Sequence, residues 1–283
     1  MHVVKTRIAV VLACHNRRRH TLDCLRSLYR QASPTLQFDV HLLDDASTDG
    51  TADAVLAEFP DVHVICGTGK LFWGGGMRAA MTKALPTPFD HMLWLNDDVE
   101  LKPDAVRGLL IAYHHACRDT GQDMNVIVGC MQDPDTGLIS YSGFLRASRW
   151  HPTRLHRVVP ARDEVVGCDT MNGNLVLVPR IVVDRVGIID EAFPHQLGDI
   201  DYGFRVGRAG GRVLLAPGIA GFCAANAVKT RREGVLGRLR HLLSPRGLPL
   251  QAWVTFLWRY AGLLCVPLLV AIYGKAIFTR AAR

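Results

Sequence analysis

The sequence predicts an α/β fold, a mostly parallel sheet with helices on both of its faces. Short apolar runs rich in β-branched residues alternate with segments of helical periodicity through the first hundred residues, a pattern typical of parallel sheets. Three polar clusters, at 14–17, 44–49 and 96–98, each directly follow an expected strand. Ligands bind beyond the carboxyl ends of strands in such sheets, so these clusters predict a shared binding rim.

The expected elements follow from hydrophobic spacing and capping residues. In the first half, strands are expected at 8–14, 40–43, 62–65 and 91–95. Helices are expected at 17–31, at 52–59 behind a polar capping stretch, at 74–84 behind a glycine-rich turn, and from Pro103 onward. The second half is less regular, with strands expected at 126–131, 174–178 and 212–215 and a short helix at 202–209.

Charge divides the chain into a body, 1–228, and a tail, 229–283. The tail has ten Lys or Arg and one acid, Glu233, whereas the body has 23 bases and 25 acids, a net charge of −2. A basic tail indicates a large anionic partner such as a membrane surface or nucleic acid, or else a solvated tail. Because long aliphatic runs interrupt the basic residues, nucleic acid is disfavoured.

The tail is also strongly apolar over 253–278. Its uncharged stretch, 260–274, is 15 residues long, shorter than the roughly 20 residues that span a bilayer. Tryptophans at 253 and 258 and basic flanks favour a helix that lies in the membrane interface. A true membrane span and a core or dimer helix are the alternatives, and a homo-oligomer stays open.

Cysteine and histidine usage disfavours a zinc protein. The eight cysteines form no C-x-x-C pair and lie in apolar stretches, which indicates reduced thiols in the cytoplasm. The start of the chain has no small-residue cleavage pattern of a secretory signal. The histidines at 114, 115, 151 and 156 have no Cys or acid at ligand spacing.

Two acidic clusters are candidates for chemistry. Asp97 and Asp98 follow a strand with no obvious basic partner, which predicts Mg²⁺ or Mn²⁺ shared with substrate phosphates. In the other cluster, Asp199 or Asp201 would be a general base, and Arg205 would orient an acid or meet a phosphate. The alternatives are a turn for the first pair and helix caps for the second.

Three consecutive glycines, Gly74, Gly75 and Gly76, are expected to precede a helix and to let the backbone approach a ligand. Their spacing matches neither the P-loop nor G-x-G-x-x-G, which disfavours an ATPase or a dehydrogenase. The alternative is a tight turn between a strand and a helix.

Together these motifs resemble the family 2 glycosyltransferases, which have the GT-A fold, and especially bacterial envelope-polysaccharide enzymes such as rhamnosyl- and galactofuranosyltransferases. The resemblance covers residues 7 to about 226. The matching segments are Ala13-Cys14-His15-Asn16-Arg17, Asp44-Asp45-Ala46-Ser47-Thr48-Asp49-Gly50-Thr51, Phe72-Trp73-Gly74-Gly75-Gly76-Met77, Leu95-Asn96-Asp97-Asp98-Val99 and Gly198-Asp199-Ile200-Asp201-Tyr202-Gly203.

The resemblance implies a role for each motif. Residues 1–100 would form the nucleotide-binding half, with Asn16, Arg17, Asp45, Trp73, Gly74, Gly75, Gly76 and Asp97 at the donor and Asp98 as metal ligand. Residues 101–228 would form the acceptor half, with Asp199 as catalytic base and Asp201, Arg205 and His195 supporting the base or the acceptor. The sequence departs from the family pattern in two places: Asn96 stands where the family has an acid, and residues 221–226 contain no histidine.

The resemblance therefore implies a metal-dependent, inverting glycosyltransferase. It would move a sugar, with rhamnose as one candidate, from a dTDP- or UDP-sugar to a lipid-linked or polysaccharide acceptor of the cell envelope. Such an enzyme is expected in the cytoplasm, peripheral on the inner face of the cytoplasmic membrane. The alternative is a nucleotidyltransferase using a nucleotide and Mg²⁺, although 14–19 contains no glycine.

Overall fold

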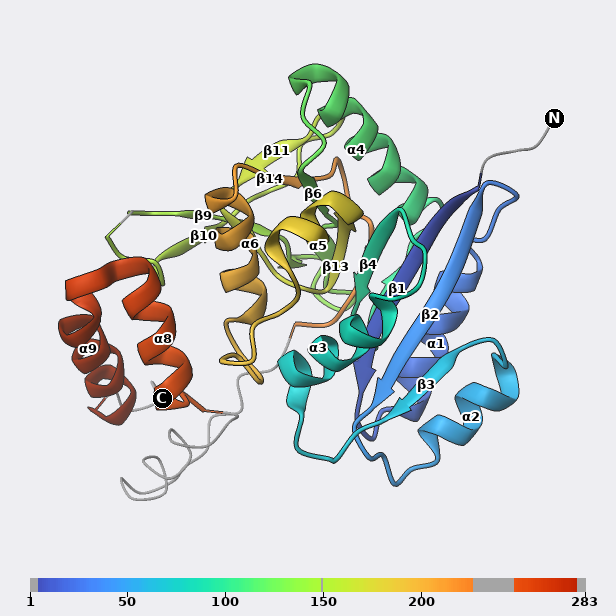
Figure 1. The fold of residues 1–283 in the computed structure, drawn as a ribbon, viewed down its shortest axis with the longest axis horizontal. Coiled ribbons are helices and arrows are strands. Elements are labelled where there is room, and N and C mark those ends of the chain that lie inside the picture. Colours follow the sequence, from blue (N-terminus) through green and yellow to red (C-terminus); the bar gives the residue numbers. More distant parts are fainter. Residues whose placement is uncertain (1–4, 149, 226–246, 279–283) are drawn as a thin grey trace.

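The computed structural model describes residues 5–148, 150–225 and 247–278, and its centre is an eight-stranded sheet (Figure 1). Across the sheet the strands are β11 (Val166–Cys168), β14 (Arg212–Leu215), β6 (Asn125–Val128), β13 (Leu175–Pro179), β4 (His91–Leu95), β1 (Thr6–Cys14), β2 (Leu36–Asp44) and β3 (His63–Cys66). The expected α/β fold is confirmed, and the first four expected strands are all present.

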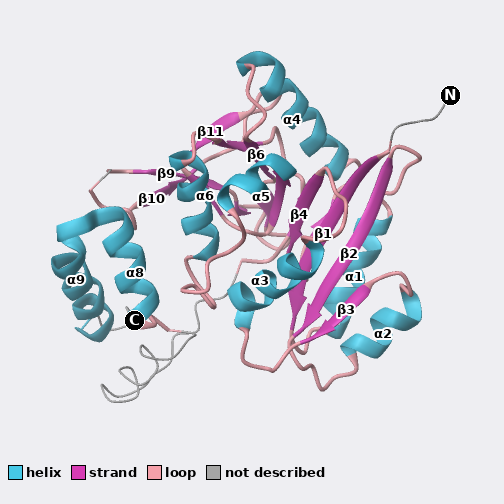
Figure 2. Ribbon diagram, in the orientation of Figure 1, coloured by secondary structure: helices cyan, strands magenta, loops and turns pink. Residues whose placement is uncertain are grey.

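Helices cover both faces of this sheet (Figure 2). One face packs against α1 (Arg18–Tyr29), α2 (Thr51–Glu58) and α4 (Ala105–Thr120), and the other against α3 (Phe72–Ala84), α5 (Arg180–Val186) and α6 (Gly198–Arg208). The alternation of side chains along a strand explains the two cores. In β1, Ile8, Val10 and Leu12 belong to the first core, and Ala9 and Val11 to the second.

The sheet is mixed in direction. Strands β4, β1, β2 and β3 are parallel neighbours, as are β6 and β14, whereas β13 runs antiparallel between β4 and β6. Leu175, the first residue of β13, pairs with Leu95, the last residue of β4. The segment before β13 therefore reaches the edge of the sheet where β1, β2 and β4 end.

Two smaller sheets extend this edge. One contains β5 (Glu100–Leu101), β7 (Met131–Gln132), β8 (Ile139–Tyr141) and β15 (Gly221–Phe222), and the other β9 (Gly143–Arg146), β10 (Leu155–Arg157) and β12 (Thr170–Met171). Most of these strands were not expected from the sequence, because they have only two to four residues and carry little periodicity.

The described part of the tail forms a helical pair. By composition, Leu250–Ala276 is apolar enough to cross a membrane, but Gly262, with φ of +57°, divides it into α8 (Leu250–Ala261) and α9 (Cys265–Phe278). These helices lie side by side (Figure 1). They are about 18 and 21 Å long, each shorter than the roughly 30 Å hydrocarbon layer.

Helix α8 packs against the body of the protein. Its buried face, which includes Phe256, Leu257 and Tyr260, forms one hydrophobic cluster with Ile200 and Phe204 of α6. The division into a body and a separate tail stays a prediction, but α8 shares a core with the helix that carries the expected base.

Candidate active site

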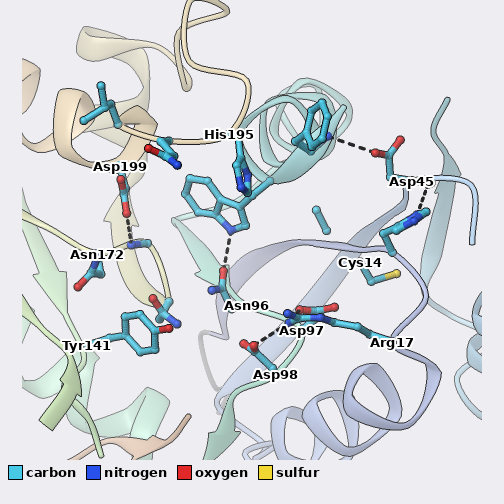
Figure 3. Close-up of a pocket in the computed structure, with 18 of the residues that line it drawn as sticks. Cys14, Arg17, Asp45, Asn96, Asp97, Asp98, Tyr141, Asn172, His195 and Asp199 are labelled. Carbon is cyan, nitrogen blue, oxygen red and sulfur yellow. Dashed lines mark hydrogen bonds and ion pairs between the residues drawn. The ribbon is translucent and has the colours of Figure 1, made fainter. Parts of the chain in front are cut away.

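A cavity of about 560 Å³ lies beyond the carboxyl ends of β1, β2 and β4 (Figure 3). Its walls include residues from every polar cluster that the sequence places after a strand: Cys14, His15, Arg17, Asp45, Asn96, Asp97 and Asp98. The antiparallel entry into β13 adds Asn172 and Asn174, the loop before α6 adds His195 and Gln196, and the first turn of α6 adds Asp199. The cavity therefore brings the two acidic clusters of the sequence into one site.

Asp97 and Asp98 have a basic partner, Arg17, which the sequence analysis did not identify. Its Nη1 donates to Asp98 Oδ2 at 2.6 Å and to Asp97 Oδ1 at 3.1 Å. The expectation that the two carboxylates have no basic neighbour is therefore wrong. Burial raises the pKa of Asp97 to about 7, while the charge of Arg17 opposes that rise. Arg17, Asp97 and Asp98 face one another in the close-up (Figure 3).

Asn96 and Cys223 support this acid pair from two sides. Trp73 Nε1 donates to Asn96 Oδ1 at 2.7 Å, which fixes the indole in the cavity wall. Cys223 Sγ donates to Asp98 Oδ1 at 3.4 Å, and burial raises the pKa of this thiol, so it stays protonated. Asn96 and Cys223, which lies in the segment 221–226 that has no histidine, thus both make hydrogen bonds at the acid pair or the cavity wall.

Asp45 organises the loop between β3 and α3. Its Oδ1 accepts from the Gly69 amide at 2.7 Å, and its Oδ2 accepts from the amides of Leu71 and Phe72 at 2.9 and 3.2 Å. Asp45 is 5% exposed and lines the cavity. Its carboxylate therefore holds the segment that carries Phe72 and Trp73 against the site.

The three glycines lie within α3, rather than in a turn before it, and none of them lines the cavity. A Cβ on Gly74 would collide with the Phe193 carbonyl oxygen, and one on Gly76 would lie 2.8 Å from the Ala13 Cβ. The Gly75 amide donates to the Pro194 carbonyl oxygen at 2.9 Å. The small size of Gly74 and Gly76 therefore lets α3 pack closely on the loop before His195 and on β1, and contact of the glycines with a donor stays a prediction.

Asn16 does not line this cavity but another one that Arg17 and Asp98 also line, and its contact with the donor stays a prediction. Its Oδ1 accepts from the Thr48 amide at 2.8 Å, and its own amide donates to Ser47 Oγ at 2.9 Å. Asn16 thus ties the loop after β1 to the loop after β2.

Backbone strain concentrates around the cavity. Among the described residues, five that are not glycine have φ in the left-handed region, namely Asn16, Ala46, Phe72, Asp104 and Leu197. Asn16, Ala46 and Leu197 lie in loops near the cavity, and Phe72, the first residue of α3, lines it. Strain of this kind persists where the surrounding structure enforces it, which is common at functional sites.

Asp199 begins α6 and faces the cavity from the side opposite the acid pair, with Asn96 between them (Figure 3). Its Oδ2 accepts from the Gly173 amide at 3.0 Å, and its Oδ1 accepts from the Ile200 amide at 2.8 Å. Desolvation in the protein wall raises the pKa of Asp199, and these backbone hydrogen bonds oppose the rise. A carboxylate with a raised pKa has the basicity that proton abstraction needs.

Asp201 and Arg205 do not line the cavity, and their expected support of the base or the acceptor stays a prediction. Asp201 is fully buried, and its carboxylate accepts from Arg205 Nε at 2.7 Å, from Arg259 Nη1 at 2.6 Å and from the Tyr260 hydroxyl at 2.7 Å. Arg205 also donates to the carbonyl oxygens of Val186 and Ile188. Both residues fasten α6 to α8 and to the chain before it. His195 lines the cavity, and its expected supporting role stays a prediction.

The acid pair suits a hard divalent cation. Asp97 Oδ2 is buried and accepts no hydrogen bond from the described residues, and the Asp98 side chain is 22% exposed. Two carboxylates are enough for Mg²⁺ or Mn²⁺, which complete their shells with water and substrate phosphates. A separate cluster of Asp39, His41 and His63 lies elsewhere on the sheet and is not part of this cavity.

Sequence reasoning left several cavity residues unassigned. Tyr141, at the end of β8, was not considered, and Asn172, Asn174 and Gln196 had no assigned role, although all four line the cavity. The polar run around Asn172 and Asn174, directly before a buried strand, is the signal that would have found two of them.

Solved structures similar to this chain share the GT-A fold. One is GalNAc-T7 with UDP, GalNAc and Mn²⁺, with a TM-score of 0.62 and 13% identity over 81% of this chain and 45% of that chain. Another is the mannosyltransferase PcManGT from Pyrobaculum calidifontis in complex with GDP-Man and Mn²⁺, with a TM-score of 0.52 and 18% identity over 98% of this chain and 77% of that chain.

The sequence comparisons show similarity to known glycosyltransferases. Residues 9–130 match the model of glycosyl transferase family 2. The N-acetylglucosaminyl-diphospho-decaprenol L-rhamnosyltransferase of Mycobacterium tuberculosis is 26% identical, over 63% of this chain and 64% of its own length. The undecaprenyl-phosphate mannosyltransferase of Micrococcus luteus is 25% identical, over 66% of this chain and 73% of its own length. Residues 9–130 are thus similar to the family 2 glycosyltransferases.

Proposed function

We propose that this protein transfers a sugar from a nucleotide diphosphate donor to a lipid-linked acceptor, with inversion at the anomeric carbon. The observation that carries this proposal is the single cavity that holds Asp199 on one side and Arg17, Asp97 and Asp98 on the other. The isolated carboxylate of Asp199 suits a general base. A cation held by Asp97 and Asp98 would suit the binding of a diphosphate. The relatives from Mycobacterium tuberculosis and Micrococcus luteus, whose names specify polyprenyl-linked substrates, support the same class of acceptor.

Asp199 would take the proton from the attacking hydroxyl of the acceptor. Its raised pKa and its fixed position, held by the amides of Gly173 and Ile200, favour that role. The attack would come from the face opposite the departing diphosphate, because the acid pair lies across the cavity. A single base and an in-line displacement produce inversion and need no covalent intermediate.

The donor side would bind the nucleotide diphosphate. Asp45, Phe72 and Trp73 line the cavity around the loop that Asp45 organises, and Arg17 supplies positive charge. Asp98, with Asp97, would hold Mg²⁺ or Mn²⁺, which would neutralise the negative charge that grows on the leaving diphosphate. The sugar carried by the donor, with rhamnose as one candidate, is a finer proposal that rests on the rhamnosyltransferase relative.

The tail would dock the enzyme on the inner face of the cytoplasmic membrane. Leu250, Val254 and Trp258 recur every four residues on α8 and are 48%, 38% and 63% exposed, on the side away from the core. Val266 and Val270 of α9 are also exposed, and the sequence has no acid after Glu233. An apolar stripe with basic flanks suits insertion into the interface of an anionic bilayer.

Calorimetric titration with UDP, dTDP and GDP, each with and without Mn²⁺, tests the donor site. The proposal expects one of these diphosphates to bind in a manner that Mn²⁺ strengthens and that Asp98→Asn weakens. Binding of nucleoside triphosphates with release of pyrophosphate would instead favour a nucleotidyltransferase. No binding of any diphosphate with or without the metal would contradict the proposal.

A further inference from the structure

Asp39, His41 and His63 gather in the sheet at a distance from the cavity. Asp39 and His41 lie on β2, and His63 is the first residue of the edge strand β3, paired in register with His41. Asp44, at the cavity end of β2, follows Asp39 by five residues, so the cluster lies about 17 Å from that end of the strand. Its chemistry is therefore separate from that of Asp97 and Asp98.

The two histidines contact the Asp39 carboxylate at different oxygens, and one possible ligand atom of each residue lies within 4.8 Å of the others. His63 Nε2 lies 2.9 Å from Asp39 Oδ1, and His41 Nε2 lies 3.1 Å from Asp39 Oδ2. The two imidazole rings stack with their centroids 4.9 Å apart, so that both present the same ring nitrogen to the carboxylate. In a tetrahedral zinc site with bonds of about 2.0–2.1 Å, neighbouring ligand atoms lie about 3.3 Å apart. The two His–Asp spacings differ from that value by only a few tenths of an ångström, each to a different oxygen of Asp39.

The environment suits a metal that enters from solvent. The His41 side chain is 4% exposed and anchors the cluster, Asp39 is 32% exposed, and His63 is 60% exposed. Burial lowers the pKa of His41, which favours the neutral imidazole that a metal requires. Two imidazoles and one carboxylate leave an open position for water and prefer zinc or its neighbours to Mg²⁺.

We propose that Asp39, His41 and His63 form a binding site for a divalent transition metal of the zinc class, which fastens the edge strand β3 to β2. The metal would link the two strands in addition to the backbone hydrogen bonds between β2 and β3, which join His41–Asp44 to His63–Cys66. The site is independent of sugar transfer, because it lies outside the cavity and uses none of its residues.

Titration of the full-length protein with Zn²⁺ against a chromophoric chelator tests this site, in a buffer with a non-thiol reductant and excess Mg²⁺ to saturate the oxygen ligands of the cavity. His63→Ala and Asp39→Asn should each weaken one Zn²⁺ site by at least about 100-fold. His156→Ala, which removes an exposed histidine of β10, should bind Zn²⁺ as the wild type does.

The same variants give a second readout in thermal unfolding. Zn²⁺ at about 100 times its Kd should raise the Tm by about 5 °C in the wild type and in His156→Ala, and by less than 1 °C in His63→Ala. Because His63 lies on an exposed edge strand, its variant should keep the metal-free Tm of the wild type. Zn²⁺ binding of wild-type affinity in His63→Ala, or a wild type that binds no more Zn²⁺ than this variant, would overturn the proposal.

Discussion

Arg259→Met tests whether the tail is fastened to the catalytic body. The substitution keeps the aliphatic bulk of the side chain but removes the guanidinium, whose Nη1 lies 2.6 Å from Asp201 Oδ1 and whose Nη2 lies 2.9 Å from Asp190 Oδ2. Asp201 is fully buried and two residues from Asp199. Loss of Arg259 therefore weakens the neutralisation of a buried charge next to the expected base.

The expected loss in the free energy of unfolding depends on the hydrogen-bond partners that Asp201 retains. Removing one partner of a buried ion pair costs about 3–5 kcal/mol. Because Asp201 retains hydrogen bonds from Arg205 and Tyr260, we expect a loss at the lower end of that range, about 3 kcal/mol. Asp201→Asn in the Arg259→Met background should recover part of the loss, since it removes the unpaired charge.

Urea unfolding followed by circular dichroism at neutral pH measures the change in the free energy of unfolding. Arg107→Met is the matched control, because Arg107 is 73% exposed and lies 3.9 Å from Asp104, and such a pair contributes less than about 0.5 kcal/mol. A loss of less than about 0.5 kcal/mol in Arg259→Met would refute the view that this network fixes α8 to α6.

Three further predictions concern pH, the acid pair and the membrane. Burial lowers the pKa of His91 to about 4, so the unfolded chain binds this proton more readily and stability is lost as the pH falls from about 6.5 to 4. His91→Phe should remove about 3 kcal/mol of that loss, measured by urea unfolding at pH 7 and pH 4. Arg17→Gln should raise the affinity for Mn²⁺ alone by about tenfold, since the acid pair loses its counter-charge; unchanged affinity in calorimetry, with Arg19→Gln as control, would contradict this. Trp258→Ser should reduce sedimentation with anionic vesicles by at least half relative to Leu138→Ser, and equal sedimentation would remove α8 from the membrane contact.

The fold and the rim of the cavity could be predicted because they depend on local signals. Buried strands such as 8–14 and 91–95 are continuous apolar runs, and the polar residues after them mark the edge where ligands bind. The approach of Asp199 to this edge could be predicted through the family resemblance alone, since its distance along the chain from Asp98 is large.

Other parts depend on contacts that the sequence does not express. Arg17 reaches Asp97 and Asp98 across about 80 residues of chain, and Asp201 meets Arg259 across 58. A glycine can allow either close packing or the approach of a ligand. The role of Gly74 and Gly76 could therefore be assigned only when their neighbours in the fold were known. The cluster of His41 and His63 was invisible because it depends on the register between two strands.

Asp199→Asn is the most direct test of the central claim, that one carboxylate across the cavity from the acid pair acts as the base. Transfer from the diphosphate-sugar donor to a polyprenyl-linked acceptor is measured in single turnover, and donor binding is measured by calorimetry. The account predicts a loss of transfer of at least about 100-fold with donor affinity within about twofold, while Asp184→Asn, an exposed control, keeps both. Transfer at the wild-type rate, or loss of donor binding in Asp199→Asn, would contradict it.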